Sequence, residues 1–131
     1  MAEIKQDARQ GIKVAIADFT FADFVSGTGK AAVKLPQNAI VVAGYLAIST
    51  AFDSVTSDTI TVGDAAVANR YKAGINGQSA ALTALVPTGF KTTAAGDVLI
   101  TWTGVGTAPT AGAGRLVLQY IVTTRAESTQ D

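Results

Sequence analysis

The stretch 97–124 constrains the fold most, because two alternating apolar segments flank a loop of Gly, Ala, Thr and Pro. Side chains that recur at every second position share one face of an extended chain. The apolar members of these faces are Val98, Ile100 and Trp102 in the first segment, and Leu116, Leu118, Tyr120 and Val122 in the second. The period of two predicts a pair of half-buried strands on which the rest of the molecule packs.

Further strand candidates lie along the whole chain. They cover 12–25, 32–35, 39–52, 59–64, 67–75, 81–85 and 90–93. The longest apolar run is 39–52, which predicts a central strand, and Gly44 within it indicates a bulge or a close backbone approach. The segment 81–85 also suits one or two helical turns, but a strand is favoured.

Two segments allow more specific predictions. Within 12–25, the residues Ile12, Val14 and Ile16 are expected to face the core. The apolar phase changes after Asp18, so a bulge there would bring Phe19 and Phe21 onto that face. Asn76–Gly77 is the strongest hairpin signal in the chain and predicts a turn between 67–75 and 81–85.

About eight strands, with turn signals roughly every 8–12 residues, predict an all-β fold. The expected architecture is an antiparallel β-sandwich or barrel, and a jelly roll fits the strand count. A chain of 131 residues is most simply one domain. We predict an N-terminal arm at 1–10, a single β-sandwich domain at 11–124 and a C-terminal tail at 125–131.

The composition disfavours several classes of function. The formal net charge is zero, which argues against binding to nucleic acid or to anionic membranes. No apolar run approaches the roughly 20 residues that cross a bilayer. The polar N-terminal segment 1–10 predicts synthesis in the cytoplasm. The chain has no cysteine and no histidine, so thiolate chemistry and the commonest general base are missing. We expect neither an enzyme nor a bound cofactor or metal.

Short motifs do not change this expectation. The segment SGTGK at 26–30 resembles the end of a phosphate-binding loop, but Phe24 and Ala31 stand where that loop needs Gly and a hydroxyl residue. Asp53 and Asp58 flank a polar turn. A turn whose backbone is capped by these side chains is favoured over weak calcium binding. No spacing brings two carboxylates together for catalysis.

Several segments in order resemble a known class of protein. The chain is similar to the small virion structural proteins of tailed bacteriophages, in particular capsid decoration or cement proteins. The similarity spans roughly 35–124 and is carried by LPQNAIVVAGYLAISTAFDS (35–54), TITVGD (59–64), NRY (69–71), LVPTGFKTTAAGDVLITWTG (85–104) and APTAGAGRLVLQYIV (108–122). The resemblance implies a jelly-roll or related sandwich that binds the major capsid protein on the outer surface of an assembled head. It implies no catalytic residues.

Such a role suggests where contacts would form. The arm 1–10 and the loop 104–114 are the candidate contact segments, and the residues expected to make the contacts are Ile4, Lys5, Arg9, Val105 and Thr107. Many identical weak contacts can hold a particle protein through avidity. Because homo-oligomers are usually symmetric, a dimer or trimer is expected.

Two alternatives remain open. The chain could be a head-fibre or tail component of the virion. It could also be a carbohydrate-binding module on the particle surface, because Tyr45, Tyr71 and Tyr120 with Trp102 could form a stacking platform for sugars.

Overall fold

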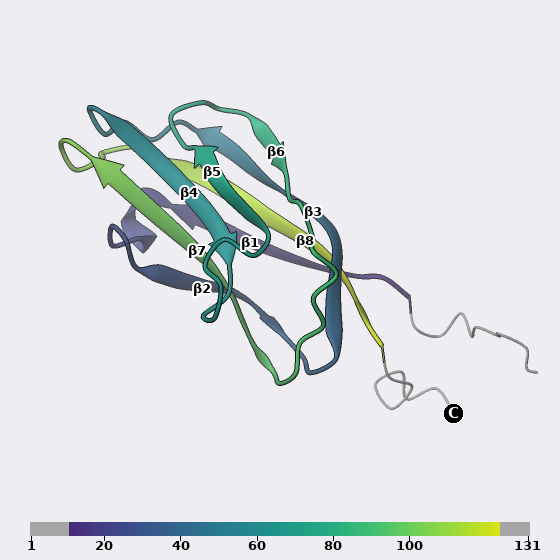
Figure 1. Cartoon of the computed structure of the whole chain (residues 1–131). Coiled ribbons are helices and arrows are strands. Elements are labelled where there is room, and N and C mark those ends of the chain that lie inside the picture. The colour runs from purple at the N-terminus through teal and green to yellow at the C-terminus, as the bar shows by residue number, and fades with distance from the viewer. Residues whose placement is uncertain (1–10, 124–131) are drawn as a thin grey trace, which may run out of the picture.

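The computed structural model describes residues 11–123 of the chain. The positions of the expected arm and tail lie outside this range. Eight strands and one short 3-10 helix, η1 (Phe21–Asp23), make up the fold (Figure 1). The strands are β1 (Lys13–Thr20), β2 (Gly29–Leu35), β3 (Ala39–Thr50), β4 (Ser57–Gly63), β5 (Lys72–Asn76), β6 (Leu82–Ala84), β7 (Gly96–Val105) and β8 (Ala113–Val122).

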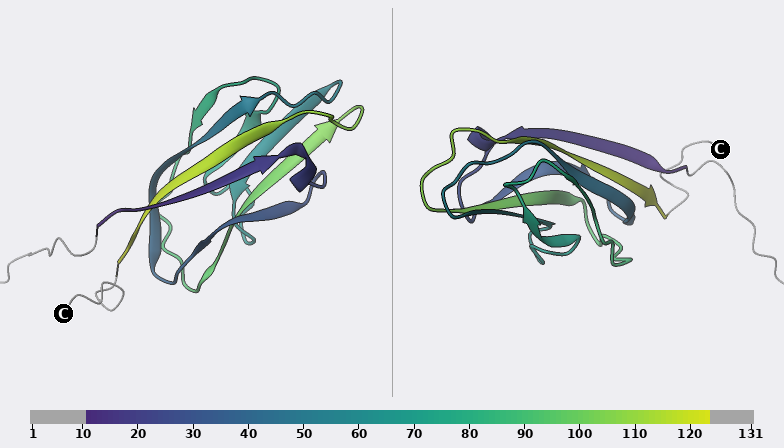
Figure 2. Two further views of the ribbon diagram at one scale, coloured as in Figure 1. Left: turned by 180° about the vertical axis from the view of Figure 1, so that it is seen from behind. Right: turned by 90° about the horizontal axis from the view of Figure 1, so that it is seen from above.

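The strands form two four-stranded sheets. The first sheet has the order β1-β8-β3-β6, the second has the order β2-β7-β4-β5, and every pairing is antiparallel. Figure 2 shows the two sheets facing each other as layers. Every connection crosses from one sheet to the other except the one between β4 and β5. This order is that of a jelly roll, and the predicted antiparallel sandwich of about eight strands is confirmed.

The core fills the space between the sheets. On β7, Val98, Ile100 and Trp102 are buried, as the alternation predicted. Ile60 and Val62 on β4 and Leu116 and Leu118 on β8 are fully buried. Burying one such aliphatic side chain contributes about 1.5–3 kcal/mol, so this set accounts for much of the hydrophobic stabilisation.

The prediction for the face of β1 was wrong. Ile12, Val14 and Ile16 are 60%, 57% and 57% exposed, whereas Phe19 is buried. The pairing with β8 runs without a bulge from Lys13↔Tyr120 to Thr20↔Ala113. With an unbroken phase, anchoring Phe19 in the core turns the even-numbered residues of β1 outward.

The hairpin predicted at Asn76–Gly77 is also absent. β5 pairs with β4 in the second sheet, and β6 pairs with β3 in the first. The Gly77 N–H donates to the Asp58 carbonyl over 2.8 Å, and the side chain of Asn76 accepts the Gln78 N–H over 2.9 Å. These bonds make a crossing turn, so the chain changes sheets where a hairpin would have kept it in one.

Three other predictions had different outcomes. The segment 81–85 does hold a strand, β6, although it has only three residues. The segment 90–93 is not a strand, and contributes only a single bridge between Lys91 and Ile40. Gly44 makes the predicted close approach, because a Cβ there would lie 2.5 Å from the Val117 carbonyl oxygen. None of residues 11–123 lies in a helix long and apolar enough to cross a membrane.

Candidate interaction surface

The two predicted contact segments belong to opposite ends of the sandwich. β8 begins next to the loop 106–112 and runs ten residues to Val122, beside the start of β1. A strand of that length spans about 30 Å, and Figure 1 shows the loop and the start of β1 at opposite poles. Ile4, Lys5 and Arg9 lie outside the described residues.

The loop after β7 is held in place by Asp53. Its carboxylate accepts the Thr110 N–H and hydroxyl over 2.7 and 2.6 Å, and the Ala111 N–H over 3.1 Å. The hydrogen bond from the Thr110 hydroxyl, followed by that from its N–H, lowers the pKa of Asp53. Val105 is 49% exposed and Thr107 is exposed. The last residue of β7, Val105, and the anchored loop that follows it with Thr107 therefore expose both predicted contact residues.

The outer face of the first sheet is apolar. Val14 and Ile16 of β1 project from it, and Leu82 on β6, at the opposite edge, is 65% exposed. The register places its side chains in rows: Ile16, Val117 and Tyr45 form one, and Val14, Gln119 and Ala43 form the next. We call this surface the apolar face, and its large members are Ile12, Val14, Ile16, Ile40, Tyr45, Leu82, Val117 and Ile121. Val117 points to this side but is covered by its neighbours and only 7% exposed.

Within residues 11–123, the strands of the apolar face carry one ion pair, and Lys91 lies opposite Ile40 at the margin of the face. Asp18 and Arg115 are opposite each other on β1 and β8, and the guanidinium donates two hydrogen bonds to the carboxylate over 2.6 and 3.1 Å. The hydrogen bond from Arg115 lowers the pKa of Asp18, and the same bond raises the pKa of Arg115. The pair neutralises itself, so between the four strands the face carries apolar area with little net charge.

The outer face of the second sheet is polar. Ile60, Val62 and Ile100 point into the core, so the threonines between them point outward. In the register Thr59 is opposite Thr103, and Thr61 is opposite Thr101. The sandwich therefore has one apolar and one hydroxyl-rich side.

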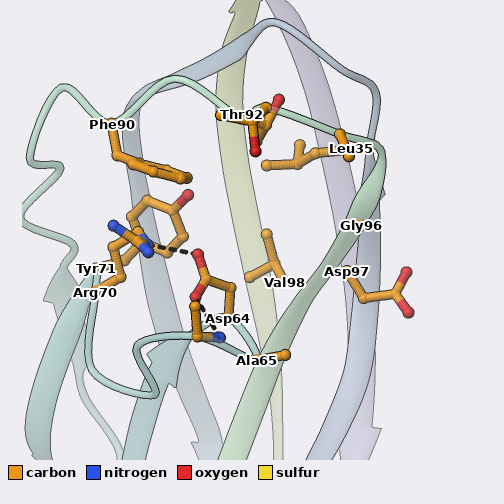
Figure 3. A pocket seen from close by; sticks show the side chains of 13 residues that line it. Leu35, Asp64, Ala65, Arg70, Tyr71, Phe90, Thr92, Gly96, Asp97 and Val98 are labelled. Carbon is orange, nitrogen blue, oxygen red and sulfur yellow. Dashed lines mark hydrogen bonds and ion pairs between the residues drawn. The ribbon is translucent and has the colours of Figure 1, made fainter.

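A cavity of about 190 Å³ lies at one corner of the sandwich (Figure 3). Arg70 stacks over Phe90 with 3.5 Å between its Cζ atom and the ring centroid, and its Nε donates to Asp64. Asp64 also accepts the N–H groups of Ala66 and Val67. Burial opposes ionisation of Asp64, but the bonds from Arg70 and Val67 outweigh it and lower the pKa of Asp64.

The polar groups of this corner thus satisfy one another. Burial raises the pKa of the neighbouring Tyr71 phenol, which favours its neutral form. The Tyr71 carbonyl accepts the Val86 N–H over 2.7 Å, which ties the segment after β6 to this corner. The arrangement supports a structural role for the corner.

The aromatic residues do not form a common platform. Tyr71 and Trp102 are buried, at 2% and 6% exposure, and Tyr120 points inward from β8. Tyr45 lies on the apolar face. The geometry therefore separates the four side chains on which a sugar-stacking surface would depend.

The sequence pattern did not predict the apolar face. Ile12, Val14 and Ile16 were assigned to the core, and the assignment required a bulge at Asp18. The signal that could have corrected it is the alternate series Ala15, Ala17 and Phe19, which needs no change of phase.

No protein-family model matches the chain, and no curated protein matches it. Solved structures do match. One chain of the capsid asymmetric unit of cyanophage Pam1 has a TM-score of 0.73 and 20% identity, over 94% of this chain and 93% of that one. A chain of the acid-stable capsid structure of Helicobacter pylori bacteriophage KHP30 has a TM-score of 0.64 and 18% identity, over 86% of this chain and 89% of that one. At these identities the likeness establishes a shared fold.

Proposed function

We propose that this protein is a structural component of a bacteriophage particle that decorates and stabilises the capsid by binding the major capsid protein lattice. The observation that carries the proposal is the apolar face, a surface with one self-neutralising ion pair on a sandwich whose opposite side is rich in threonine. Large exposed apolar patches mark interaction sites on soluble proteins. The matching chains belong to phage capsid structures and share nearly the whole extent of this fold.

The polarity of the two sides suggests an orientation on the particle. The apolar face would lie against the capsid, and the hydroxyl-rich side would face the solvent. Complete burial of a valine or isoleucine side chain contributes about 1.5–3 kcal/mol, and Val14 and Ile16 are only half covered in the free molecule. Each copy would bind modestly, and repetition over the lattice would supply the avidity.

The contacts predicted at the two ends fit a bracing role. The arm with Ile4, Lys5 and Arg9 would bind near one pole, and Val105 and Thr107 would bind at the other. A molecule held at both poles can contact two neighbouring capsid subunits, which is how a decoration protein would resist their separation. We also propose that copies associate as a dimer or trimer at a symmetry axis.

Quantitative mass spectrometry of purified particles tests the proposal. Decoration requires a copy number that is comparable with that of the major capsid protein, and a particle reconstruction should place the density on the outer surface of the head. Particles that lack the protein should lose their integrity at a lower temperature. A few copies per particle, or density confined to a fibre or the tail, would replace decoration by one of those roles.

A further inference from the structure

The four edge strands of the sandwich differ in how they are protected. β6 has only three residues, and the pairing of β5 with β4 is interrupted between Ile60 and Val62. β2 contains an irregularity between Ala31 and Val33 and carries two lysines. Short length, bulges and lysines are devices that stop an edge from pairing with another chain.

The edge strand β1 lacks those devices. It pairs with β8 over eight consecutive residues without a bulge and contains no proline. Its single lysine is Lys13, at the first position, and its acidic residue Asp18 is neutralised by Arg115. The Thr20 N–H on the free side of β1 donates to the Asp23 carboxylate over 2.8 Å. From Lys13 to Phe19, the backbone groups on that side form a regular row that has no partner within residues 11–123.

The side chains of β1 are also incompletely covered. Only Phe19 is buried among the eight residues. Val14 and Ile16 project from the outer side, while Ala15 and Ala17 on the inner side are partly buried against the core. Both sides of the strand thus leave apolar surface open beside the free edge.

A groove lies beneath this edge, where β1 approaches β2. Its volume is about 160 Å³. Buried Phe19, Phe24 and Ile100 contribute to its lining, and the small side chains of Ala17, Ala31 and Ala32 leave it open. The charged residues Asp18, Asp23 and Lys30 also line it. The apolar part of the lining suits a branched aliphatic side chain that enters from a strand alongside β1, and the charged residues suit a polar backbone or side-chain group beside it.

We propose that β1 accepts an extended segment of the capsid protein as a fifth strand of the first sheet. This inference rests on the proposed function. The added strand would pair with the free backbone groups of β1, one set of its alternate side chains would enter the groove, and the other set would lie beside Val14 and Ile16. Strand addition at an exposed edge derives affinity from the main chain and specificity from such alternate pockets.

Two occupants from the protein itself fit less well. A second copy of β1 would offer Ala15 and Ala17 on its inner side, and methyl groups would leave the groove unfilled. The segment 1–10 has Ile4 as its only bulky apolar residue after Met1, so it lacks the required alternation. A strand with aliphatic residues at every second position is the fitting partner.

A pair of prolines tests the backbone pairing. Successive N–H groups of a strand point to opposite sides, so one of Ala15→Pro and Ile16→Pro removes an N–H that is bonded to β8 and the other removes a free one. The variant that loses the N–H bonded to β8 should lose thermal stability. The variant that loses the free N–H should keep its melting temperature, because proline is tolerated at a free edge. The stable variant should bind capsids assembled without the protein about tenfold more weakly than the wild type.

A matched pair of truncations tests the side chains. Val14→Ala should weaken capsid binding severalfold, while Val86→Ala should leave it unchanged, since Val86 is similarly exposed but distant from β1 in the fold. If both proline variants unfold, hydrogen exchange of the wild-type protein tests whether β1 pairs with an added strand. The free-edge amides of 13–20 should exchange quickly in the isolated protein and become protected on capsids.

The outcomes separate this inference from the proposed function. If the wild type does not bind capsids, the decoration role fails and the strand addition fails with it. If the wild type binds but the stable proline variant binds equally well, or the amides of β1 stay unprotected, only the strand addition is overturned.

Discussion

Asp58 is a buried carboxylate at the centre of a hydrogen-bond cluster. It is 1% exposed, and its oxygens accept the Trp102 indole N–H over 2.9 Å and the Ser54 N–H over 3.0 Å. The side-chain amide of Gln78 donates to the same carboxylate over 3.0 Å. Sequence reasoning placed Asp58 in a turn with capping side chains, and the structure adds that it fixes the tryptophan of the core.

Replacing Asp58 by alanine should therefore be costly. Three donors would lose their acceptor in a buried site, and we expect the free energy of unfolding to fall by about 3 kcal/mol or more. Urea unfolding followed by Trp102 fluorescence measures this loss. Asp97→Ala is the control, because Asp97 is exposed and should change stability by less than about 0.5 kcal/mol. Equal stability of the two variants would contradict the role of Asp58.

Gly44 allows a second prediction at the scale of single residues. A Cβ at this position would lie 2.5 Å from the Val117 carbonyl oxygen and 2.9 Å from a methyl group of Leu85. Gly44→Ala should thus force β3 away from β8 and destabilise the protein by about 2 kcal/mol. Gly96→Ala is the matched control, because nothing lies within 4 Å of a Cβ there. Its expected effect is neutral to slightly stabilising, and thermal unfolding compares the two.

At the scale of elements, β1 shows what a sequence pattern can and cannot determine. The alternation identified the strand, but both of its faces carry apolar residues, so the pattern alone did not say which face is inward. The aromatic ring of Phe19 decides it, because it packs edge-on against Phe24 with 5.4 Å between the ring centroids. That contact depends on η1 and the following turn, whose geometry the sequence did not reveal.

The exposed stripe of β1 should contribute to attachment more than to folding. A variant with Ile12, Val14 and Ile16 all replaced by threonine keeps β-branched side chains at exposed positions. We expect its free energy of unfolding to stay within about 1 kcal/mol of that of the wild type. Its occupancy on purified particles should fall strongly. A variant that unfolds readily would show instead that the stripe is part of the core.

Candidate sites were harder to predict than strands. Val105 at the end of β7 and Thr107 in the following anchored loop are exposed, as contact residues should be, but their role stays a proposal. The apolar face was not foreseen because it is assembled from β1, β8, β3 and β6, which are far apart in the chain. Strand order, which creates such a surface, does not follow from local alternation.

The acid sensitivity of the whole molecule follows from three carboxylates. Hydrogen bonds to Asp18, Asp53 and Asp64 lower their pKa values in the folded state. A carboxyl group whose pKa is lower in the folded state than in the unfolded state stabilises the fold at pH values above its unfolded-state pKa. This contribution is lost as the pH falls through the folded-state pKa. Because the chain has no histidine, the free energy of unfolding should be nearly constant from about pH 5 to 8 and should decline below about pH 4.

Urea titrations at a series of pH values check this profile. Asp64→Asn should remove part of the acid decline, because the neutral amide no longer titrates. A transition near pH 6 would be inconsistent with the three carboxylates as its source.

The antiparallel pairing of β1 with β8 brings the strand that enters the sandwich next to the strand that leaves it, with Lys13 opposite Tyr120. A short glycine–serine linker at that pole could close the backbone into a ring, and new ends could be opened in a surface loop elsewhere. The sandwich of residues 11–123 thus offers a scaffold for circular permutation in which a genetically fused cargo can be placed away from the pole where β1 begins and β8 ends.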